Sequence, residues 1–363
     1  MKQGEILNHF QKIAAQLKER DLDAMLLTGE ANRFYASGFH SSGTDGVALV
    51  TPAQAYYFTD SRYIEAAERY VKDAIVEEAR RGRGYYTLLN EVIDARKIRR
   101  MGFEDSYMTV ADHENYRKQL HCELVPATQL LLELRQVKDD QELEAMTAAQ
   151  RIAEKALEDI LELIRPGVTE REIAARLQYL MLHYGAENMS FDPIVVSGPN
   201  GSLPHGVPGD RQIQKGEFVT MDFGCIYRGY CSDMTRTVAV GYATEEMERI
   251  YQTVLEAQRA GIASARAGIT GQALDGVARE IITDAGYGKF FGHSFGHGVG
   301  VEIHEKPNVS YANETPLPAG AVVSAEPGIY LPGRMGVRIE DVIVLTAGGC
   351  QDITKAPKDL LVL

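Results

Sequence analysis

The chain has 363 residues, of which 45% are hydrophobic and 25% are charged, a composition typical of a globular protein long enough for two domains. Its formal net charge of -13 argues against binding to nucleic acid or to an anionic membrane surface, because both require basic faces. No apolar run approaches the ~20 residues of a membrane-spanning helix, and no signal peptide is visible, so we expect a cytoplasmic protein. The spacing of the four cysteines predicts reduced, mostly buried thiols: Cys122, Cys225, Cys231 and Cys350.

Helical and strand patterns alternate in the first part of the chain, which predicts an α/β layer domain. An amphipathic helix is expected over residues 1–20, and another helix is expected to begin at Arg62. A domain boundary is predicted near 134–138, where a charged run begins, so that residues 1–135 form the first domain and residues 136–363 form the second. The expected strands of the first domain are 24–28, 46–51, 55–59, 74–76 and 100–103.

The second domain combines long helices with strand-rich sequence. Pro166 and Gly167 separate the first two helices, and Thr169 with Glu172 has the spacing of a capping box. The four helices are expected near 140–164, 169–184, 244–265 and 271–285.

A pattern that occurs twice in the second domain carries most of the information. A glycine is followed six residues later by a carboxylate, then by a turn and a second carboxylate, which predicts a β-hairpin in each case. If Asp222 opposes Asp233, the first turn falls at 227–228; if Glu326 opposes Glu340, the second turn falls on Gly333. Like charges opposed across a strand pair are destabilising, so we expect cations between the four carboxylates.

A glycine-rich segment between the two hairpins adds nitrogen ligands. Residues 291–304 contain His293, His297 and His304, three of the nine histidines of the chain. His293 and His297 are four residues apart, but each glycine in a helix would cost about 1 kcal/mol, so the segment is expected to be extended or looped. His297 and His304 are then expected to point into one cleft, where four carboxylates and an imidazole suffice for two divalent ions.

The order of these acidic residues and one histidine resembles the five-ligand dinuclear site of the "pita-bread" metallopeptidases, the group of methionine aminopeptidase, aminopeptidase P, prolidase and creatinase. Residues 32–39 and 59–63 look like the creatinase-type N-terminal domain, which methionine aminopeptidase lacks. The resemblance covers nearly the whole chain. It implies an α/β N-terminal domain and an α+β pita-bread catalytic domain, with helices on one face of a curved antiparallel sheet. The implied metal ligands are Asp222, Asp233, His297, Glu326 and Glu340.

The resemblance also implies a role for each ligand. Asp222 would chelate one ion, His297 and Glu326 would lie on the other side, and Asp233 and Glu340 would bridge the two ions. A water shared by the ions would attack the scissile carbonyl, with Glu326 as the proton shuttle. The oxygen-rich ligand set favours Mn(II), with Co(II), Zn(II) or Fe(II) as alternatives. Relatives of this kind are expected to form homodimers.

Four further residues match positions that handle the substrate in the family. His293 and His304 would hydrogen-bond the substrate and the tetrahedral oxyanion. His205 matches a histidine on the substrate side, and Arg338 matches an arginine that supports the site or the substrate backbone. Three of these assignments have simpler alternatives: His293 can be a structural histidine, His205 can be an ordinary residue of a Gly/Pro-rich loop, and Arg338 can merely neutralise the acidic residues.

The implied activity is hydrolysis of the bond before proline in a proline-containing peptide. An Xaa-Pro aminopeptidase of the aminopeptidase P type is expected first, because dipeptidases of the family often carry an arginine four residues after the outer histidine, where this chain has Asn308. An Xaa-Pro dipeptidase (prolidase) is the main alternative. A creatinase-like C–N hydrolase and a non-catalytic peptide-binding scaffold are also considered, although a scaffold would typically lack some of the five ligands.

Overall fold

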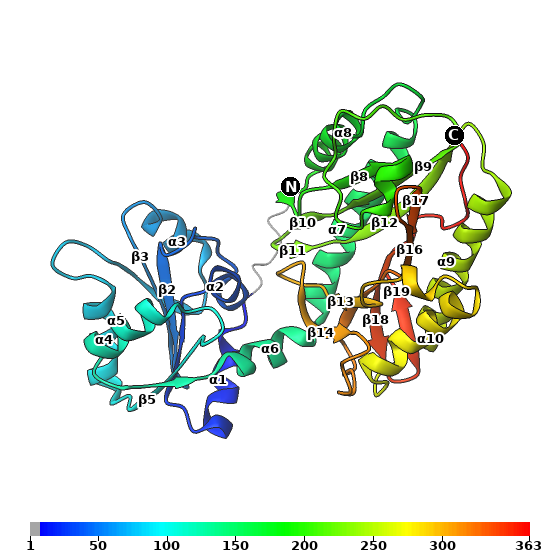
Figure 1. Ribbon diagram of the computed structural model, residues 1–363. Coiled ribbons are helices and arrows are strands. Elements are labelled where there is room, and N and C mark those ends of the chain that lie inside the picture. Colours follow the sequence, from blue (N-terminus) through cyan, green and yellow to red (C-terminus); the bar gives the residue numbers. More distant parts are fainter. Residues whose placement is uncertain (1–7) are drawn as a thin grey trace. The chain divides into compact units, whose positions relative to one another are not determined.

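The computed structural model describes residues 8–363, and the chain divides into two compact units, Met1–Arg135 and Gln136–Leu363 (Figure 1). Each unit has its own sheets and its own buried apolar clusters. No helix within residues 8–363 has the length and apolar character needed to cross a membrane. The expected fold class, an α/β domain followed by an α+β domain, is confirmed.

The first unit is built on a six-stranded sheet with the order β4-β3-β2-β1-β5-β6. All of its strands run parallel except β2, which pairs antiparallel with both β1 and β3. The strands are β1 (Ala24–Leu27), β2 (Gly46–Val50), β3 (Ala55–Thr59), β4 (Ala74–Glu78), β5 (Arg100–Phe103) and β6 (Glu123–Pro126). The helices are α1 (Phe10–Leu17), α2 (Glu30–Ser37), α3 (Ile64–Tyr70), α4 (Tyr85–Arg96), α5 (Val110–Gln119) and α6 (Thr128–Gln136).

The five strands predicted for this unit are present within about two residues of the expected bounds. The predicted first helix ends earlier, because α1 is followed by a 3-10 turn at Lys18–Arg20, and its expected residues 1–7 lie outside the described residues. The sequence did not predict α2, α4, α5, β6 and α6. In α5 the reason is clear: no residue of this helix is buried, so it has no apolar stripe that a periodic pattern could reveal.

The second unit contains the four predicted helices and antiparallel strands. The helices are α7 (Asp140–Leu161), α8 (Glu170–His183), α9 (Glu245–Ser264) and α10 (Gly271–Asp284). The expected capping box is present, with the Thr169 side chain bonded to the backbone of Glu172 and the Glu172 side chain bonded back to Thr169. The strands are β7 (Asn188–Met189), β8 (Ile194–Ser197), β9 (Glu217–Phe223), β10 (Cys225–Tyr227), β11 (Tyr230–Cys231), β12 (Met234–Val240), β13 (Gly296–Gly298), β14 (Glu305–Val309), β15 (Val322–Ala325), β16 (Gly328–Leu331), β17 (Met335–Arg338), β18 (Asp341–Thr346) and β19 (Gly349–Asp352).

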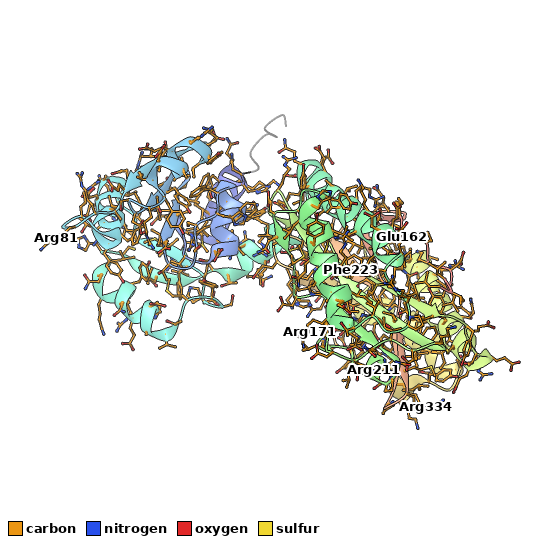
Figure 2. The ribbon with its side chains drawn as sticks, turned by 90° about the horizontal axis from the view of Figure 1, so that it is seen from above. Arg81, Glu162, Arg171, Arg211, Phe223 and Arg334 are labelled. Carbon is orange, nitrogen blue, oxygen red and sulfur yellow. The ribbon has the colours of Figure 1, made fainter. Side chains whose placement is uncertain are left out.

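Strand alternation separates the core of this unit from its polar side. On β9, Val219, Met221 and Phe223 belong to the apolar cluster that includes α7 and α8. Figure 2 shows Phe223 within this unit, whereas Arg171 and Arg334 lie at its surface. Because successive side chains of a strand point to opposite faces, Asp222 points away from this cluster. The same alternation on β15 places Val323 and Ala325 in a second cluster with α9 and α10.

The register of the first hairpin differs from the prediction. Asp222 lies opposite Thr235, not opposite Asp233, and the ladder continues to Tyr227 opposite Tyr230. The turn is therefore Arg228-Gly229, where φ is 51° and 75°. Two positive φ values are those of the two-residue turn that matches strand twist, and glycine adopts them without steric cost. Asp233 is thus displaced by two residues from the position opposite Asp222, which avoids directly opposed like charges.

The register of the second hairpin agrees with the prediction. Ala325 pairs with Asp341, and Gly328 pairs with Arg338, so the turn is centred on Gly333, which has a φ of 68°. Glu326 lies between β15 and β16, and Glu340 lies between β17 and β18. Both residues are therefore at the junction of the two strand pairs.

Candidate metal centre

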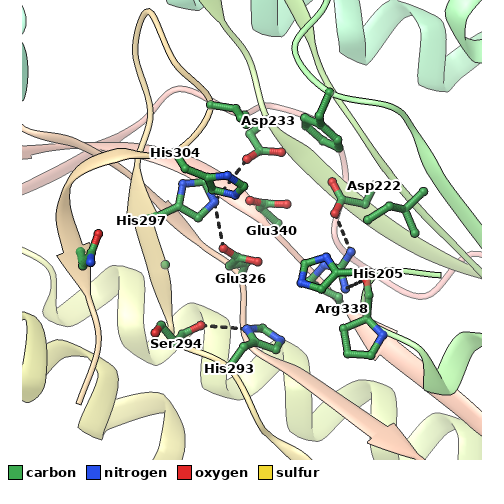
Figure 3. Close-up of a pocket in the computed structure, with 16 residues that line it drawn as sticks. His205, Asp222, Asp233, His293, Ser294, His297, His304, Glu326, Arg338 and Glu340 are labelled. Atoms are coloured by element: carbon green, nitrogen blue, oxygen red, sulfur yellow. Dashed lines mark hydrogen bonds and ion pairs between the residues drawn. The ribbon is translucent and has the colours of Figure 1, made fainter. Parts of the chain in front are cut away.

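A cavity of about 460 Å³ in the second unit is lined by every predicted site residue (Figure 3). Asp222 and Asp233 come from the first hairpin, Glu326 and Glu340 from the second, and His297 from the strand β13 between them. The complete set is His205, Asp222, Asp233, His293, His297, His304, Glu326, Arg338 and Glu340.

His297 is oriented so that one ring nitrogen faces the carboxylates. Its Nδ1 is 3.1 Å from the carbonyl oxygen of Gly298, which assigns a ring proton to Nδ1 and directs Nε2 toward the carboxylates. Nε2 lies 3.2 Å from Oε1 of Glu326 and 3.7 Å from Oδ2 of Asp233. The Ser324 hydroxyl donates to Oε1 of Glu326 and accepts from the backbone N–H of His297, which fixes both residues relative to β15.

Two carboxylates of the site each have one oxygen that is bonded and one that is not. Arg338 donates from Nη2 to Oδ2 of Asp222 at 2.5 Å, and the Thr235 hydroxyl donates to Oε2 of Glu340 at 2.7 Å. The other oxygens, Oδ1 of Asp222 and Oε1 of Glu340, are buried and have no hydrogen-bond partner in the described part of the chain. Buried polar atoms are rarely left unpaired, so these two oxygens need a positive or donating group that none of the described residues provides.

The electrostatics of the cavity also call for positive charge. Burial, together with the negative charge of neighbouring carboxylates, raises the pKa of Asp233 and of Glu340 well above the usual range. Burial alone lowers the pKa of His297, but the hydrogen bond and charge of Glu326 outweigh it and raise the pKa to about 9. Burial likewise raises the pKa of Glu326, but the hydrogen bond and charge of His297 outweigh it and lower the pKa to about 2. The carboxylates are therefore stable only with protons or cations among them.

The donor atoms are close enough together to ligate a cation. Asp233, His297 and Glu340 each offer one ligand atom, and these three atoms lie within 4.8 Å of one another. Hard carboxylate oxygens with a single imidazole are ligands that suit divalent first-row metal ions. The residues of the cavity therefore fit a divalent metal centre.

Tyr330 is a residue of the site that the sequence analysis missed. Its hydroxyl lies 2.8 Å from Nη1 of Arg338, which donates to it, and 2.8 Å from Nε2 of His293. Burial raises the pKa of Tyr330 to about 12, so the hydroxyl keeps its proton and can donate it to the histidine nitrogen. The only sequence signal was its place in the second hairpin, where Tyr330 pairs with Gly336 beside Arg338.

The same contacts bear on the role predicted for His293. Its Nδ1 is 2.9 Å from the carbonyl oxygen of Ser294 and must donate to it, so Nε2 accepts from Tyr330. Both ring nitrogens are committed, and in this arrangement His293 has no N–H to offer a substrate. A direct contact with the oxyanion would require the ring to leave these partners.

His304 and His205 lie at the open side of the cavity. The His304 ring is exposed, with its centroid 4.4 Å from that of His297, and burial together with the charge of His297 lowers its pKa. His205 follows the 3-10 turn Gly198–Ser202 in a loop that the buried Glu170 carboxylate holds through bonds from Ser197, Asn200 and Gly209. Asn308, on β14, also lines the cavity.

The chain matches two known protein families along most of its length. Residues 144–347 match Metallopeptidase family M24, and residues 10–137 match the Creatinase/Prolidase N-terminal domain. Every donor residue of the metal centre lies within the first of these matches.

Relatives resemble the chain from end to end. A protein named Xaa-Pro dipeptidase from Pyrococcus horikoshii is 38% identical over 98% of this chain and 100% of its own length. The structure of an Xaa-Pro dipeptidase from Bacillus anthracis superposes with a TM-score of 0.92 at 40% identity, covering 98% of this chain and 99% of that one. The structure of an X-Pro aminopeptidase from Thermotoga maritima also gives 0.92, at 36% identity, covering 98% of this chain and 100% of that one. The chain therefore belongs to metallopeptidase family M24, as a metallo-exopeptidase with a creatinase/prolidase-type N-terminal domain.

Proposed function

We propose that the protein is a dinuclear-metal Xaa-Pro peptidase whose preferred substrates are Xaa-Pro dipeptides. The observation that carries this proposal is the convergence of four carboxylates and one imidazole in one cavity, with two buried carboxylate oxygens left without partners. The relatives named Xaa-Pro dipeptidase support the choice of substrate. They favour the dipeptidase alternative over the aminopeptidase that the sequence analysis placed first.

The five donor residues would hold two divalent ions. When bound, such ions would supply Lewis acidity, which polarises a carbonyl oxygen and lowers the pKa of water. Mn(II) suits the oxygen-rich donor set best. The ligands proposed for the ions are Asp222, Asp233, His297, Glu326 and Glu340.

The remaining residues would orient the peptide and move protons. The Glu326 carboxylate would accept a proton from the attacking water and return it to the leaving nitrogen of proline. The His304 imidazole would donate a hydrogen bond to the substrate carbonyl oxygen as negative charge develops there. His205 would contact the substrate from the opposite loop, and Arg338 would hold Asp222 in position through the bond from Nη2.

One observation favours the second candidate, an Xaa-Pro aminopeptidase. The free carboxylate of a dipeptide is usually recognised by an arginine, whose planar fork matches it bidentately. Arg338 is the only arginine that lines the described cavity, and it already bonds Asp222 and Tyr330, whereas Asn308 carries no charge. Lys306, which is exposed on β14, is not among the residues that line the cavity.

Steady-state kinetics with the Mn(II)-loaded enzyme would separate the candidates. We expect a higher kcat/KM for Ala-Pro than for Ala-Pro-Ala, no cleavage of Ala-Ala, and no hydrolysis of creatine. A preference for Ala-Pro-Ala would assign the protein to the aminopeptidases, and activity on neither proline substrate would refute the proposal. Asp233→Ala, which removes a proposed bridging ligand, is the inactive control for contaminating peptidases.

We further propose that the enzyme is a cytoplasmic homodimer. Its four cysteines, all within residues 8–363, are free thiols, as expected in a reducing compartment. Two-fold dimers are the commonest closed oligomers. Light scattering at micromolar concentration should give twice the chain mass of 40.1 kDa, and a monomer mass would contradict the dimer.

A further inference from the structure

A second cavity, of about 640 Å³, lies in the first unit and shares no residue with the metal centre. Its lining comes from chain segments that adjoin the ends of strands. Thr28 follows β1, and Gly46 and Val47 begin the antiparallel strand β2. The other contributions are the start of α4, from Gly84 to Tyr86, and the connection from β5 into α5. The cavity therefore lies along the edge of the sheet where the parallel strands end.

The topology of the sheet explains why a cavity forms at this place. From β1 the chain builds β2, β3 and β4 on one side, and then crosses over to build β5 and β6 on the other side. The strand order thus reverses at β1. In open α/β sheets, connections that diverge at such a point leave a crevice outside the carboxyl ends of the strands, where ligands commonly bind.

Tyrosine rings form much of the wall of this cavity, which we call the tyrosine cavity. The rings of Tyr86 and Tyr116 meet at an angle of 71°, with centroids 5.1 Å apart, so that they form a corner. Tyr85 and Tyr107 also line it, as do Val47 and Met108. A wall of this kind suits an occupant with an apolar surface or a positive charge, because the faces of aromatic rings attract cations.

The charge of the tyrosine cavity is negative. Asp112 is the only ionisable acid in its lining, and none of the described residues that line it is a lysine, arginine or histidine. The Asp112 carboxylate is held in the first turn of α5 by the hydroxyl of Thr109, at 2.6 Å. Nearby, Arg62 is paired with both Asp45 and Asp60, so these three residues add a further net negative charge.

Tyr85 contributes its ring to the wall of the tyrosine cavity. Its hydroxyl oxygen is buried and has no hydrogen-bond partner within the described residues. Burial raises the pKa of Tyr85 to about 12, and the charges of Asp60 and Asp45 act in the same direction. Tyr85 therefore adds an aromatic surface to the wall of the tyrosine cavity, and its buried hydroxyl is not offered to an occupant.

We propose that the tyrosine cavity binds a small organic cation with an alkylammonium group. The ammonium group would lie against the rings of Tyr86 and Tyr116 near the Asp112 carboxylate. This site is independent of the proposed peptidase activity, since none of its residues lines the metal centre.

Titration of the full-length protein with choline, followed by calorimetry or by NMR of the ligand, tests the proposal. A second titration uses 3,3-dimethylbutan-1-ol, which has the shape and the hydroxyl of choline but no charge. We expect saturable binding of choline and binding of the neutral alcohol that is about tenfold weaker, because the cation–π and charge contributions are lost. Equal binding of the two compounds, or no saturable binding of choline, would overturn the proposal.

Variants locate the bound cation. Asp112→Asn removes the charge but keeps an oxygen for the Thr109 hydroxyl, and it should weaken choline binding by about fivefold. Tyr116→Leu should weaken it at least as much, with thermal melting used to verify that the variant is folded. The matched control is Tyr70→Leu, because Tyr70 is an exposed tyrosine of the same unit outside the tyrosine cavity. Unchanged affinity in Asp112→Asn, or an equal loss in Tyr70→Leu, would place the cation elsewhere and refute the assignment.

Discussion

The hydroxyl of Tyr330 connects Arg338 and His293, two residues that no sequence pattern links. Arg338 donates to this hydroxyl and to Asp222, while the hydroxyl donates to His293. A metal-ligand candidate, a cation, a phenol and an imidazole thus form one continuous chain of hydrogen bonds. Such chains fix the orientation of each member, and the loss of one member leaves buried groups unpaired on both sides.

Removing that hydroxyl should impair catalysis while the metal content stays normal. In Tyr330→Phe, Nη1 of Arg338 loses an acceptor and Nε2 of His293 loses a donor, so both side chains gain freedom. We expect kcat/KM for Ala-Pro to fall about tenfold, which corresponds to the loss of roughly 1.4 kcal/mol of transition-state stabilisation. Steady-state kinetics and elemental analysis of the purified variant measure the two effects.

Tyr251→Phe is the matched control for this prediction. Tyr251 is another buried tyrosine of the same unit, and its hydroxyl donates to the carbonyl of Lys358, outside the metal cavity. Tyr251→Phe should lose a little stability and retain the turnover of the wild type. Wild-type kinetics in Tyr330→Phe would show that the hydrogen-bond chain has no part in catalysis.

Alanine variants of His297 and His304 should separate metal binding from the chemical step. Nε2 of His297 faces two carboxylates, whereas the exposed His304 ring lies at the open side of the cavity. His297→Ala should therefore lose bound metal. His304→Ala should keep the metal but lower kcat by about 10² or more, as expected for the loss of an oxyanion donor. Equal metal loss in the two variants would mean that His304 is also a ligand.

The residues of the candidate site were easier to predict than their contacts. Glycine spacing and turn chemistry placed the carboxylates of both hairpins near one histidine, and all nine predicted residues line one cavity. The contacts of His293 could not be predicted in the same way. They depend on a tyrosine 37 positions later and on the rotation of one peptide carbonyl, and neither leaves a periodic signal in the sequence.

The loop that carries His205 is held mainly by one buried side chain. Glu170, at the start of α8, is fully buried and accepts hydrogen bonds from the backbone N–H groups of Ser197 and Gly209. The Ser197 hydroxyl and the Asn200 side chain also donate to it. The position of His205 at the cavity therefore depends on a helix residue that does not line the cavity.

Glu170→Gln should loosen this loop without removing metal. The substituted amide keeps one acceptor oxygen but brings an NH₂ group against donors, so some bonds must break. We expect the free energy of unfolding to fall by about 2–3 kcal/mol and KM for Ala-Pro to rise several-fold. Chemical denaturation and steady-state kinetics measure these effects.

Glu172→Gln provides the control from the same helix turn. Glu172 belongs to the capping box with Thr169 and makes no bond to the loop, and glutamine is compatible with a capping box. Glu172→Gln should leave KM for Ala-Pro unchanged. A rise in KM of the same size in both variants would attribute the effect to α8 as a whole and not to the loop.

Local turn chemistry decided which hairpin could be predicted. The second hairpin has Pro332 and Gly333 at its turn, and its register agrees with the prediction. For the first hairpin, the prediction assumed that Asp222 and Asp233 are directly opposed and did not use the preference of Gly229 for a positive φ. The predicted register was therefore wrong by two residues. In the first unit, strands with continuous apolar runs were found, while α5, which buries no residue, was not.

At the scale of the molecule, the two units have separate cores and separate cavities. The apolar cluster built on the six-stranded sheet lies wholly within Met1–Arg135. All five proposed metal ligands lie within Gln136–Leu363. Binding to a folded unit stabilises that unit by mass action, so metal should act on the two units unequally.

Calorimetry should show this inequality directly. Removal of metal by a chelator should lower the melting temperature of the second unit by about 5–10 °C, the shift expected for a ligand present well above its dissociation constant, and leave the first unit unchanged. Hydrogen exchange would assign each transition to its unit. If both transitions moved together, the units would unfold as one cooperative body.

Glu340→Gln tests whether the stabilisation comes from the carboxylate centre. Without metal, the substitution removes one of several buried like charges, so the variant should melt at or above the temperature of the metal-free wild type. With Mn(II) added, the wild type should gain stability and the variant should gain little, because Oε1 of Glu340 is one of the two buried oxygens without a partner. If the metal-free variant melts well below the metal-free wild type, the bond between Glu340 and Thr235 stabilises the fold by more than the repulsion among the carboxylates destabilises it. The four carboxylates would then be a structural network first and a metal site second.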